Sequence, residues 1–112
     1  MLSLNKYKAI RTTVDGITFD SKGEARRYQQ LLLLQKAGAI SNLQHQVVYP
    51  VEINGMKVCR YIADFTYVEG SKTVVEDFKS PASITPLYRL KKKLIKALYG
   101  IDIVETQACK SK

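Results

Sequence analysis

The sequence predicts an α/β domain with the order helix, three strands, helix, strand, in which helices flank a mixed sheet and a small hairpin precedes the core. Two observations predict it. Two segments carry leucines at helical spacing, and between them lie three extended segments separated by turn signals. One sheet with helices on its faces would bury both leucine-rich segments. The 112 residues suffice for one domain, residues 1–112, whose core we place at about 20–106.

The N-terminal part predicts a hairpin followed by a helix. Residues 7–14 are strand-like, and an Asp-Gly turn leads into a second short strand at 17–19. Ser21, with Glu24 three residues later, forms the capping-box pattern that opens a helix, and Gly38 is a typical glycine after a helix end. We expect the apolar residues of this helix to be buried against the sheet: Ala25, Tyr28, Leu31, Leu32 and Leu34.

The next two strands form a second hairpin. Residues 40–53 are mostly extended, and Pro50 places this strand at a sheet edge or at a bulge. An Asn-Gly pair then predicts a type I′ turn into a strand at 56–68. In an unbroken register the paired residue numbers sum to 109, so His45 lies opposite Asp64; a bulge at Pro50 would shift this pairing by one residue.

An acidic hairpin follows, and its register is the most informative feature of the chain. With the turn centred between Gly70 and Ser71, paired residue numbers sum to 141, and Asp64 lies opposite Asp77. Directly opposed side chains have Cβ atoms roughly 4.5–5.5 Å apart, where like charges repel. Such a pair requires a proton on one acid or a cation between them. Strand alternation then places Lys79 on the same face as Asp77, which is typical of a catalytic site.

The last part of the chain predicts a second helix and a strand. Thr85 is the N-cap, Pro86 suits the first helical position, and Gly100 ends the helix before a strand at 101–106. We expect one apolar stripe to be buried: Leu87, Leu90, Leu94 and Leu98. The cations lie mostly away from this stripe and are the candidate nucleic-acid-binding residues: Arg89, Lys91, Lys92, Lys93 and Lys96.

The charge balance favours a polyanionic partner. Lys and Arg total 18 against 10 acids, a net charge of +8, which attracts nucleic acid first and an acidic membrane surface second. The longest apolar run, residues 31–34, is too short to span a bilayer, and we expect no membrane insertion. Cys59 and Cys109 lack metal-site spacing and suit reduced thiols, and no signal peptide is visible, so we expect a cytoplasmic protein.

Several residues keep two interpretations at this point. Glu24 is either only the capping-box partner of Ser21 or a third carboxylate beside the acidic hairpin. Glu76 points away from Asp77 and is expected to be a salt-bridge or surface residue rather than a ligand. A lone histidine such as His45 is more often structural than catalytic, so we leave it out of the catalytic set. The basic helix face is either a solvated surface or a nucleic-acid contact.

Asp64, twelve intervening residues and Asp77-Phe78-Lys79 resemble the D-x(n)-(D/E)-x-K signature of the PD-(D/E)XK nuclease superfamily, with Ala63 in place of the usual Pro. The wider pattern is similar to a family of small phage and prophage proteins placed in that superfamily. It includes residues 19–24, Tyr28, Leu43 with Gln46, residues 63–65 and residues 76–79. The superfamily has a restriction-endonuclease-like core of helix, three strands, helix and strand.

The resemblance implies roles for individual residues. Asp64, Asp77, the carbonyl of Phe78 and the helix-borne Glu24 would hold one or two divalent cations, normally Mg²⁺, with Mn²⁺ as a substitute. Lys79 would orient or help deprotonate the attacking water and offset transition-state charge. The implied catalytic set is therefore Glu24, Asp64, Asp77 and Lys79, and the implied chemistry is metal-assisted phosphodiester hydrolysis.

The expected function is a Mg²⁺-dependent DNA endonuclease in phage recombination or DNA processing, acting in a bacterial host on duplex or branched DNA. A homodimer would suit cleavage of two strands. One alternative is a non-catalytic nucleic-acid-binding module that keeps the fold, although such a module tends to lose its acids or lysine. Another is a phage regulator that binds a host protein through the basic helix.

Overall fold

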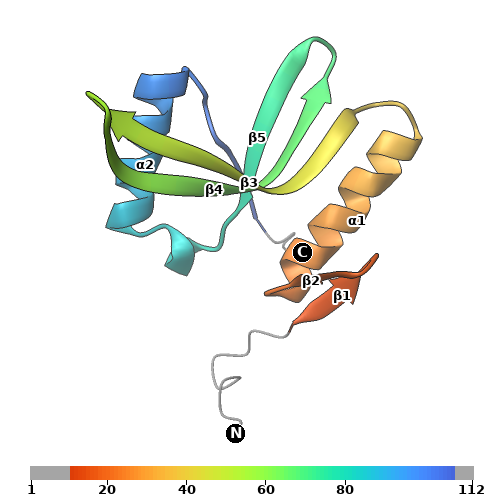
Figure 1. Cartoon of the computed structure of the whole chain (residues 1–112). Coiled ribbons are helices and arrows are strands. Elements are labelled where there is room, and N and C mark those ends of the chain that lie inside the picture. The colour runs from red at the N-terminus through yellow and green to blue at the C-terminus, as the bar shows by residue number, and fades with distance from the viewer. Residues whose placement is uncertain (1–10, 108–112) are drawn as a thin grey trace, which may run out of the picture.

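The computed structural model describes residues 11–107 as an α/β arrangement of two helices, a short 3-10 helix and six strands (Figure 1). In chain order these are β1 (Thr12–Val14), β2 (Ile17–Phe19), α1 (Lys22–Lys36), β3 (Ser41–Ile53), β4 (Met56–Glu69), β5 (Lys72–Phe78), η2 (Pro81–Ser83), α2 (Pro86–Tyr99) and β6 (Val104–Thr106). The predicted order is confirmed. Residues 7–10 of the first predicted strand and Cys109 lie outside the described residues, and the last strand is shorter than predicted.

The strands form two sheets. β1 and β2 make a small antiparallel hairpin, and the other four form a mixed sheet in the order β3-β4-β5-β6. The β3, β4 and β5 strands are antiparallel, whereas β6 runs parallel to β5 because α2 carries the chain back across the sheet. The β4–β5 pairs run from Phe65 with Glu76 to Glu69 with Lys72, so the predicted sum of 141 is confirmed.

The β3–β4 hairpin contains a bulge near Pro50, which the sequence analysis had considered as an alternative to an unbroken register. Asn54 and Gly55 both have positive φ angles, 53° and 79°, as a type I′ turn requires. The register shifts by one between Val51 and Glu52, beside Pro50, so His45 pairs with Phe65 rather than with Asp64. Pro50 also lies on an edge strand, the position in a sheet where proline is tolerated.

The first helix is less buried than predicted. Its N-cap is Ser21, whose hydroxyl accepts a hydrogen bond from the Glu24 amide at 3.1 Å. Ala25 and Leu31 are buried, but Leu34 is 40% exposed, so the prediction of its burial was wrong. The reason is that α1 packs on β3 and β5 and on the N-terminal hairpin along one narrow side, which leaves the adjacent leucine side in contact with solvent.

The buried face of the second helix also differs from the prediction. Tyr88 and Ile95 are its buried residues, Leu94 is partly buried, and three of the four predicted stripe residues are exposed: Leu87, Leu90 and Leu98. The physical reason is that Tyr88 fills the core and still satisfies its hydroxyl, which donates to Glu105 at 2.8 Å. This orientation turns the leucine stripe away from the sheet.

Two separate cores hold the fold together. One joins α2 to the sheet through Val51, Tyr61, Ala63, Val75, Tyr88, Ile95 and Ile103. The other joins α1 and the N-terminal hairpin to the sheet through Phe19, Ala25, Leu31, Ile40, Phe65 and Tyr67. Figure 1 shows the long β3–β4 hairpin reaching from α2 at one end to α1 at the other.

Both strands of this hairpin change faces between the two cores. Regular alternation would keep the odd-numbered residues of β4 on one face. However, Tyr61 and Ala63 pack in the α2 core, whereas Phe65 and Tyr67 pack in the α1 core. The break therefore falls at Asp64. Across from it on β3 lies Gln46, whose φ angle of 61° marks the same irregularity.

Candidate active site

The two aspartates lie where β4 and β5 separate. Regular pairing ends at Phe65 and Glu76, and the next contacts involve side chains. The amide of Asp64 donates to Asp77 Oδ1 at 3.2 Å, and the amide of Phe78 donates to Asp64 Oδ2 at 2.8 Å. Each carboxylate thus bonds the backbone of the opposite strand, and the structure brings the two acids together as the register predicted.

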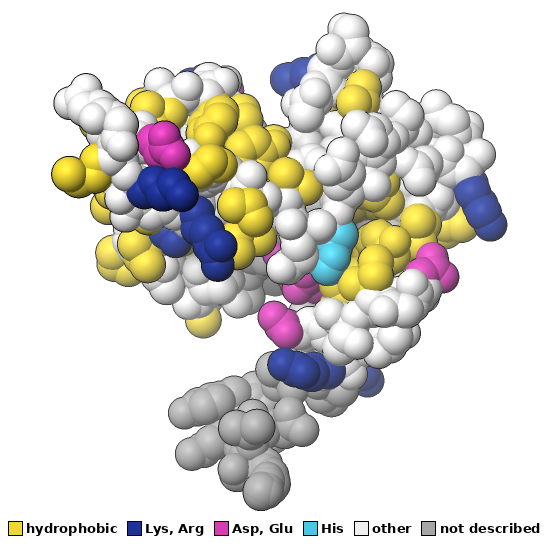
Figure 2. All heavy atoms as spheres, in the orientation of Figure 1, with side chains coloured by type: hydrophobic (Ala, Val, Ile, Leu, Met, Phe, Trp, Pro, Cys, Tyr) yellow, Lys and Arg dark blue, Asp and Glu magenta, His cyan; other side chains and the backbone are white. Residues whose placement is uncertain are grey.

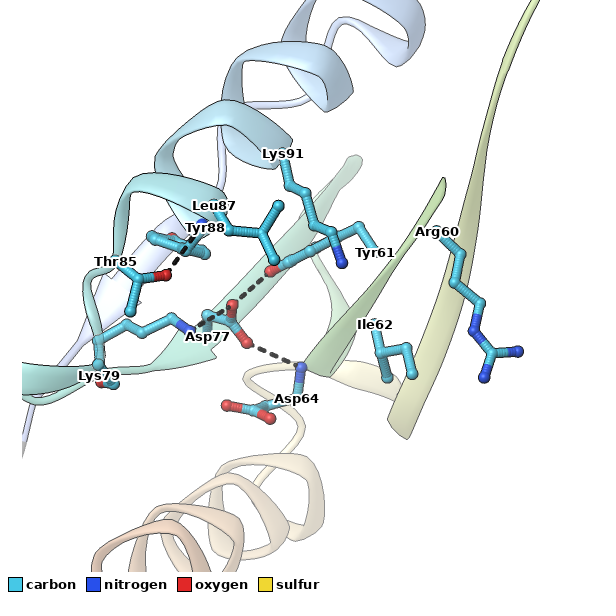
Figure 3. A pocket seen from close by; sticks show the side chains of 11 residues that line it. Arg60, Tyr61, Ile62, Asp64, Asp77, Lys79, Thr85, Leu87, Tyr88 and Lys91 are labelled. Atoms are coloured by element: carbon cyan, nitrogen blue, oxygen red, sulfur yellow. Dashed lines mark hydrogen bonds and ion pairs between the residues drawn. The ribbon is translucent and has the colours of Figure 1, made fainter. Parts of the chain in front are cut away.

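Asp77 is held by two further side chains on the α2 side of the sheet. It is 2% exposed, and its Oδ2 accepts a hydrogen bond from the Tyr61 hydroxyl at 2.6 Å. Lys79 Nζ lies 3.5 Å from the same oxygen and 4.0 Å from the centroid of the Tyr88 ring. Burial and then Asp77 raise the pKa of Tyr61, so the phenol remains a donor. Figure 3 shows these groups around one pocket of about 370 Å³.

The first turn of α1 brings Glu24 to the same region. The ring of Phe78 lies against Gly23, where a Cβ atom would come 2.5 Å from Cζ, so the helix start rests directly on the end of β5. Glu24 Oε2 lies 4.0 Å from His45 Nε2. Ser21 caps the helix, and the Glu24 carboxylate faces the sheet beside His45.

The electrostatics show an excess of negative charge at this point. Burial, then Asp77 and then Glu24 raise the pKa of Asp64 to about 8. Burial, then Asp20 and then Asp77 raise the pKa of Glu24, while Asp64 and Lys79 act in the other direction. Because Asp77 and Glu24 both disfavour ionisation of Asp64, a cation placed among these carboxylates would stabilise them.

His45 borders this acidic group, although the sequence analysis left it out of the catalytic set. Burial lowers its pKa, which favours the neutral ring. Its ring packs edge-on against Phe19 with centroids 4.8 Å apart. Among residues 11–107, His45 Nε2 is the buried side-chain nitrogen or oxygen atom without a hydrogen-bond partner. A buried atom of this kind normally has a partner, and its position beside Glu24 fits a polar ligand at the site.

The residues fit a hard divalent cation in charge and donor type. The three carboxylates and the Phe78 carbonyl offer oxygen atoms, which Mg²⁺ prefers. Asp77 has both oxygens engaged and Asp64 has one, through the contacts above. Within the described part of the chain, no group of three or more His, Cys, Asp or Glu side chains is arranged to hold a metal ion. The ligands would therefore have to reorient to bind one.

Glu76 is a salt-bridge residue, as one of its two interpretations predicted, and it is not on the surface. Its side chain is fully buried and accepts two hydrogen bonds from Arg27. Nε donates to Oε2 at 2.6 Å, and Nη2 donates to Oε1 at 3.0 Å. The hydroxyls of Tyr67 and Thr106 donate to it at 2.8 and 3.1 Å. This cluster ties α1, β4 and β6 to β5, one residue from Asp77.

A protein-family model matches residues 4–112 of the chain. It is described as a protein of unknown function, DUF1064. The chain belongs to this family. No curated protein and no solved structure matches it. In the described part of this DUF1064 member, no helix is both long and apolar enough to cross a membrane.

The cations of α2 do not form one surface in this DUF1064 member. Lys91 lines the pocket of the acids, together with Arg60 from β4. The other candidates, Arg89, Lys92, Lys93 and Lys96, border a second hollow between α2 and β6. There, Lys92 pairs with Glu105 at 2.7 Å and Lys96 with Asp102 at 2.9 Å. The predicted basic face is therefore split in two, and half of the second group is already paired.

Three residues of the site were missed by sequence reasoning. Tyr61 bonds Asp77, Tyr88 supports Lys79, and Arg60 opens onto the pocket. One signal was available for Tyr61, because a tyrosine three residues before an aspartate on a core strand must place its hydroxyl near a polar partner. Nothing in the spacing identified Tyr88, whose position depends on the rotation of α2.

Proposed function

We propose that this chain is a Mg²⁺-dependent DNA endonuclease of the PD-(D/E)XK type, with Mn²⁺ as a substitute. The observation that carries the proposal is the meeting of Asp64, Asp77 and Lys79 in one pocket, with Glu24 of α1 close enough to interact with all three. The element order helix, three strands, helix and strand supports a restriction-endonuclease-like core, and the net charge of +8 supports a polyanionic substrate.

Lys79 has the central chemical role in this scheme. Its ammonium is held between Asp77 and the Tyr88 ring, so it is positioned before substrate binds. There it attracts a phosphate, orients the attacking water and offsets charge on the developing oxyanion. Tyr61 donates to the same Asp77 oxygen that Lys79 approaches, and it thereby holds the carboxylate in the orientation that keeps Lys79 in place.

Glu24, Asp64, Asp77 and the Phe78 carbonyl would hold the cation. When bound, a divalent cation acts as a Lewis acid on the phosphate and increases the acidity of water. The raised pKa of Asp64 and of Glu24 supports this assignment, since a cation would compensate the same charge that protons compensate without it.

The proposed substrate is DNA, recognised through phosphates and shape rather than through a defined sequence. A domain of this size has little surface for reading bases, whereas its positive charge suits backbone contacts. Branched DNA and a homodimer belong to the proposal as the way to cut two strands, within DNA processing of a phage or prophage in the host cytoplasm.

Nicking of supercoiled DNA in Mg²⁺ or Mn²⁺, with linear, single-stranded and four-way-junction DNA in parallel, tests the proposal. We expect Lys79→Ala to fold and bind DNA but to cleave roughly 10²–10³-fold more slowly. Lys36→Ala, an exposed lysine in the last turn of α1, is the matched control and should cleave like wild type. Equal rates for both variants would show that the cleavage comes from a contaminant or another site.

A non-catalytic nucleic-acid-binding module is the second candidate. It is favoured by one observation, that no ready three-ligand metal group exists among residues 11–107. This candidate predicts DNA binding without cleavage and no effect of Mn²⁺ on thermal unfolding. The endonuclease predicts that millimolar Mn²⁺ raises the melting temperature and that Asp77→Asn removes most of the rise.

A further inference from the structure

The acids line a small pocket that is open to solvent. Asp77 is almost completely buried, and the pocket above it has a volume of about 370 Å³. That volume is at the lower end of the roughly 300–1,000 Å³ typical of small-ligand clefts. The pocket thus has room for about one nucleotide.

The pocket opens along a strand edge that β5 leaves uncovered. Pairing between β4 and β5 stops at Phe65, so the described structure gives the stretch of β4 before it no β5 partner. Arg60 and Ile62 from this stretch form one side of the pocket, and Leu87 and Lys91 from α2 form the other (Figure 3). The two walls come from different elements and face each other across the acids.

Both walls carry apolar side chains that are exposed to solvent. Leu87 is 60% exposed and Ile62 is 39% exposed. Val48, directly across from Ile62 on β3, extends the same surface. Figure 2 likewise shows apolar side chains beside cations over the half of the molecule that contains α2. Duplex DNA would meet these side chains with sugars and phosphates, because its bases are stacked inside. An unpaired base instead offers an apolar face.

The two cations of the pocket are placed for the backbone of the same strand. Arg60 and Lys91 flank the apolar walls, and the salt bridges found within residues 11–107 include neither of them. This differs from Lys92 and Lys96, whose charges acidic partners partly satisfy. Proteins bind single-stranded nucleic acid by combining cations along the backbone with side chains, typically aromatic, on which the bases stack. In this pocket Ile62 and Leu87 would offer aliphatic contact to a base instead.

We propose that this pocket binds an unpaired segment of DNA, with a base between Ile62 and Leu87 and adjacent phosphates on Arg60 and Lys91. The inference rests on the proposed endonuclease function and assigns its substrate class: a single strand, flap or splayed arm rather than a continuous duplex. The scissile phosphate then reaches Lys79 because the strand leaves the duplex and enters the pocket.

The test measures binding and cleavage separately. Fluorescence anisotropy without divalent metal compares one labelled oligonucleotide as a single strand, as a blunt duplex and as a duplex with an unpaired flap. We expect the single strand and the flap to bind about tenfold more tightly than the duplex. Leu87→Ala and Ile62→Ala should each remove most of this preference, whereas Leu33→Ala, a 66% exposed leucine on α1, should leave it intact.

The outcomes separate the inference from the function on which it rests. With Mg²⁺, cuts placed in the unpaired segment support the inference. Equal cleavage and binding of the blunt duplex would overturn it while leaving the endonuclease in place. Unchanged single-strand binding by Leu87→Ala and Ile62→Ala, with loss of a dimer in light scattering, would also overturn it and assign the apolar walls to self-association. Selective single-strand binding without cleavage of any DNA would support the pocket's ligand and refute the endonuclease.

Discussion

Asp64 is held in a position that disfavours its own charge. It lies at the face change of β4, beside Asp77, and its carboxylate accepts the amide of Phe78. Burial and the neighbouring carboxylates raise its pKa to about 8, far above the roughly 3.9 of an unfolded chain. In the absence of a cation, the folded state therefore binds a proton here that the unfolded state releases.

The stability of the metal-free protein should consequently fall as pH rises. Below about pH 4 Asp64 is protonated in both the folded and the unfolded state, so it does not reduce the free energy of unfolding. Between pH 4 and 8 the unfolded state releases this proton while the folded state must keep it or bear the charge, so the free energy of unfolding falls. Asp64→Asn, which retains an oxygen acceptor for the Phe78 amide, should be more stable than wild type by on the order of 1–3 kcal/mol at pH 8 and equal to it at pH 4. Urea unfolding in EDTA measures both.

Asp102→Asn is the control, because its expected change in stability has the opposite sign. The ion pair with Lys96 lowers the pKa of the exposed Asp102, so its removal should slightly lower the melting temperature at neutral pH. A metal-free Asp64→Asn that is less stable than wild type at pH 8 would contradict the electrostatic account of the site.

At the residue scale, the sequence was sufficient to predict that the two aspartates and the lysine lie close together. A two-residue turn fixes the β4–β5 register, and the register brings Asp64, Asp77 and Lys79 together. It was not sufficient for Tyr61 and Tyr88. Their roles depend on how far β4 leaves β5 and on how α2 rotates, and both are decided by packing between residues distant in the chain.

At the scale of elements, α1 is fastened to β5 by the ion pair between the partly exposed Arg27 and the buried Glu76. Arg27 and Glu24 are three residues apart and lie on one side of the helix. The bond that anchors the helix therefore also sets the position of the Glu24 carboxylate. Glu76 itself accepts four hydrogen bonds, so its charge is well satisfied only while Arg27 is present.

Removal of Arg27 should thus be costly. Arg27→Ala leaves the Glu76 carboxylate buried without a cation, and we expect a loss of about 3–5 kcal/mol in the free energy of unfolding. Adding Glu76→Gln should recover part of the loss, because the unpaired charge is gone. Chemical denaturation of both variants measures this, with the exposed neighbour Arg26→Ala as control. Similar losses for Arg26→Ala and Arg27→Ala would refute the anchoring role.

The helix faces show where sequence patterns stop being informative. The caps at Ser21 and Thr85 and the helix ends were predictable because they depend on local hydrogen bonds. The buried face of α2 was not, since both Leu87 and Tyr88 begin a plausible stripe at helical spacing. Tyr88 is the residue that is buried, because its hydroxyl donates a hydrogen bond to Glu105 of β6, and only the tertiary fold brings β6 close to α2.

At the scale of the whole molecule, the positive charge is divided between two sides of α2. Lys91 faces the candidate active site, whereas Lys92 is paired with Glu105 at the second hollow. The overall charge of +8 still attracts DNA from a distance, but only cations that reach phosphates directly add to the salt dependence of binding.

Lys91 and Lys92 should therefore differ in DNA binding although they are adjacent. Lys91→Ala should weaken binding of all sequences and reduce the slope of log K against log salt by about 0.7–0.9, the value of one phosphate contact. Lys92→Ala should change the slope by less than half as much. Anisotropy titrations at several salt concentrations measure both, and equal slopes for the two variants would show that the pairing with Glu105 yields to DNA.

The face change at Asp64 has a consequence for cooperativity. Asp64 and Gln46 lie at the joint between two cores, so local opening of either core moves one strand end relative to the other. Glu24 belongs to the α1 side of that joint, and Lys79 and Tyr61 belong to the α2 side. The candidate site is therefore intact only while both cores are folded. Local opening of the less stable core disrupts the site before the chain as a whole unfolds.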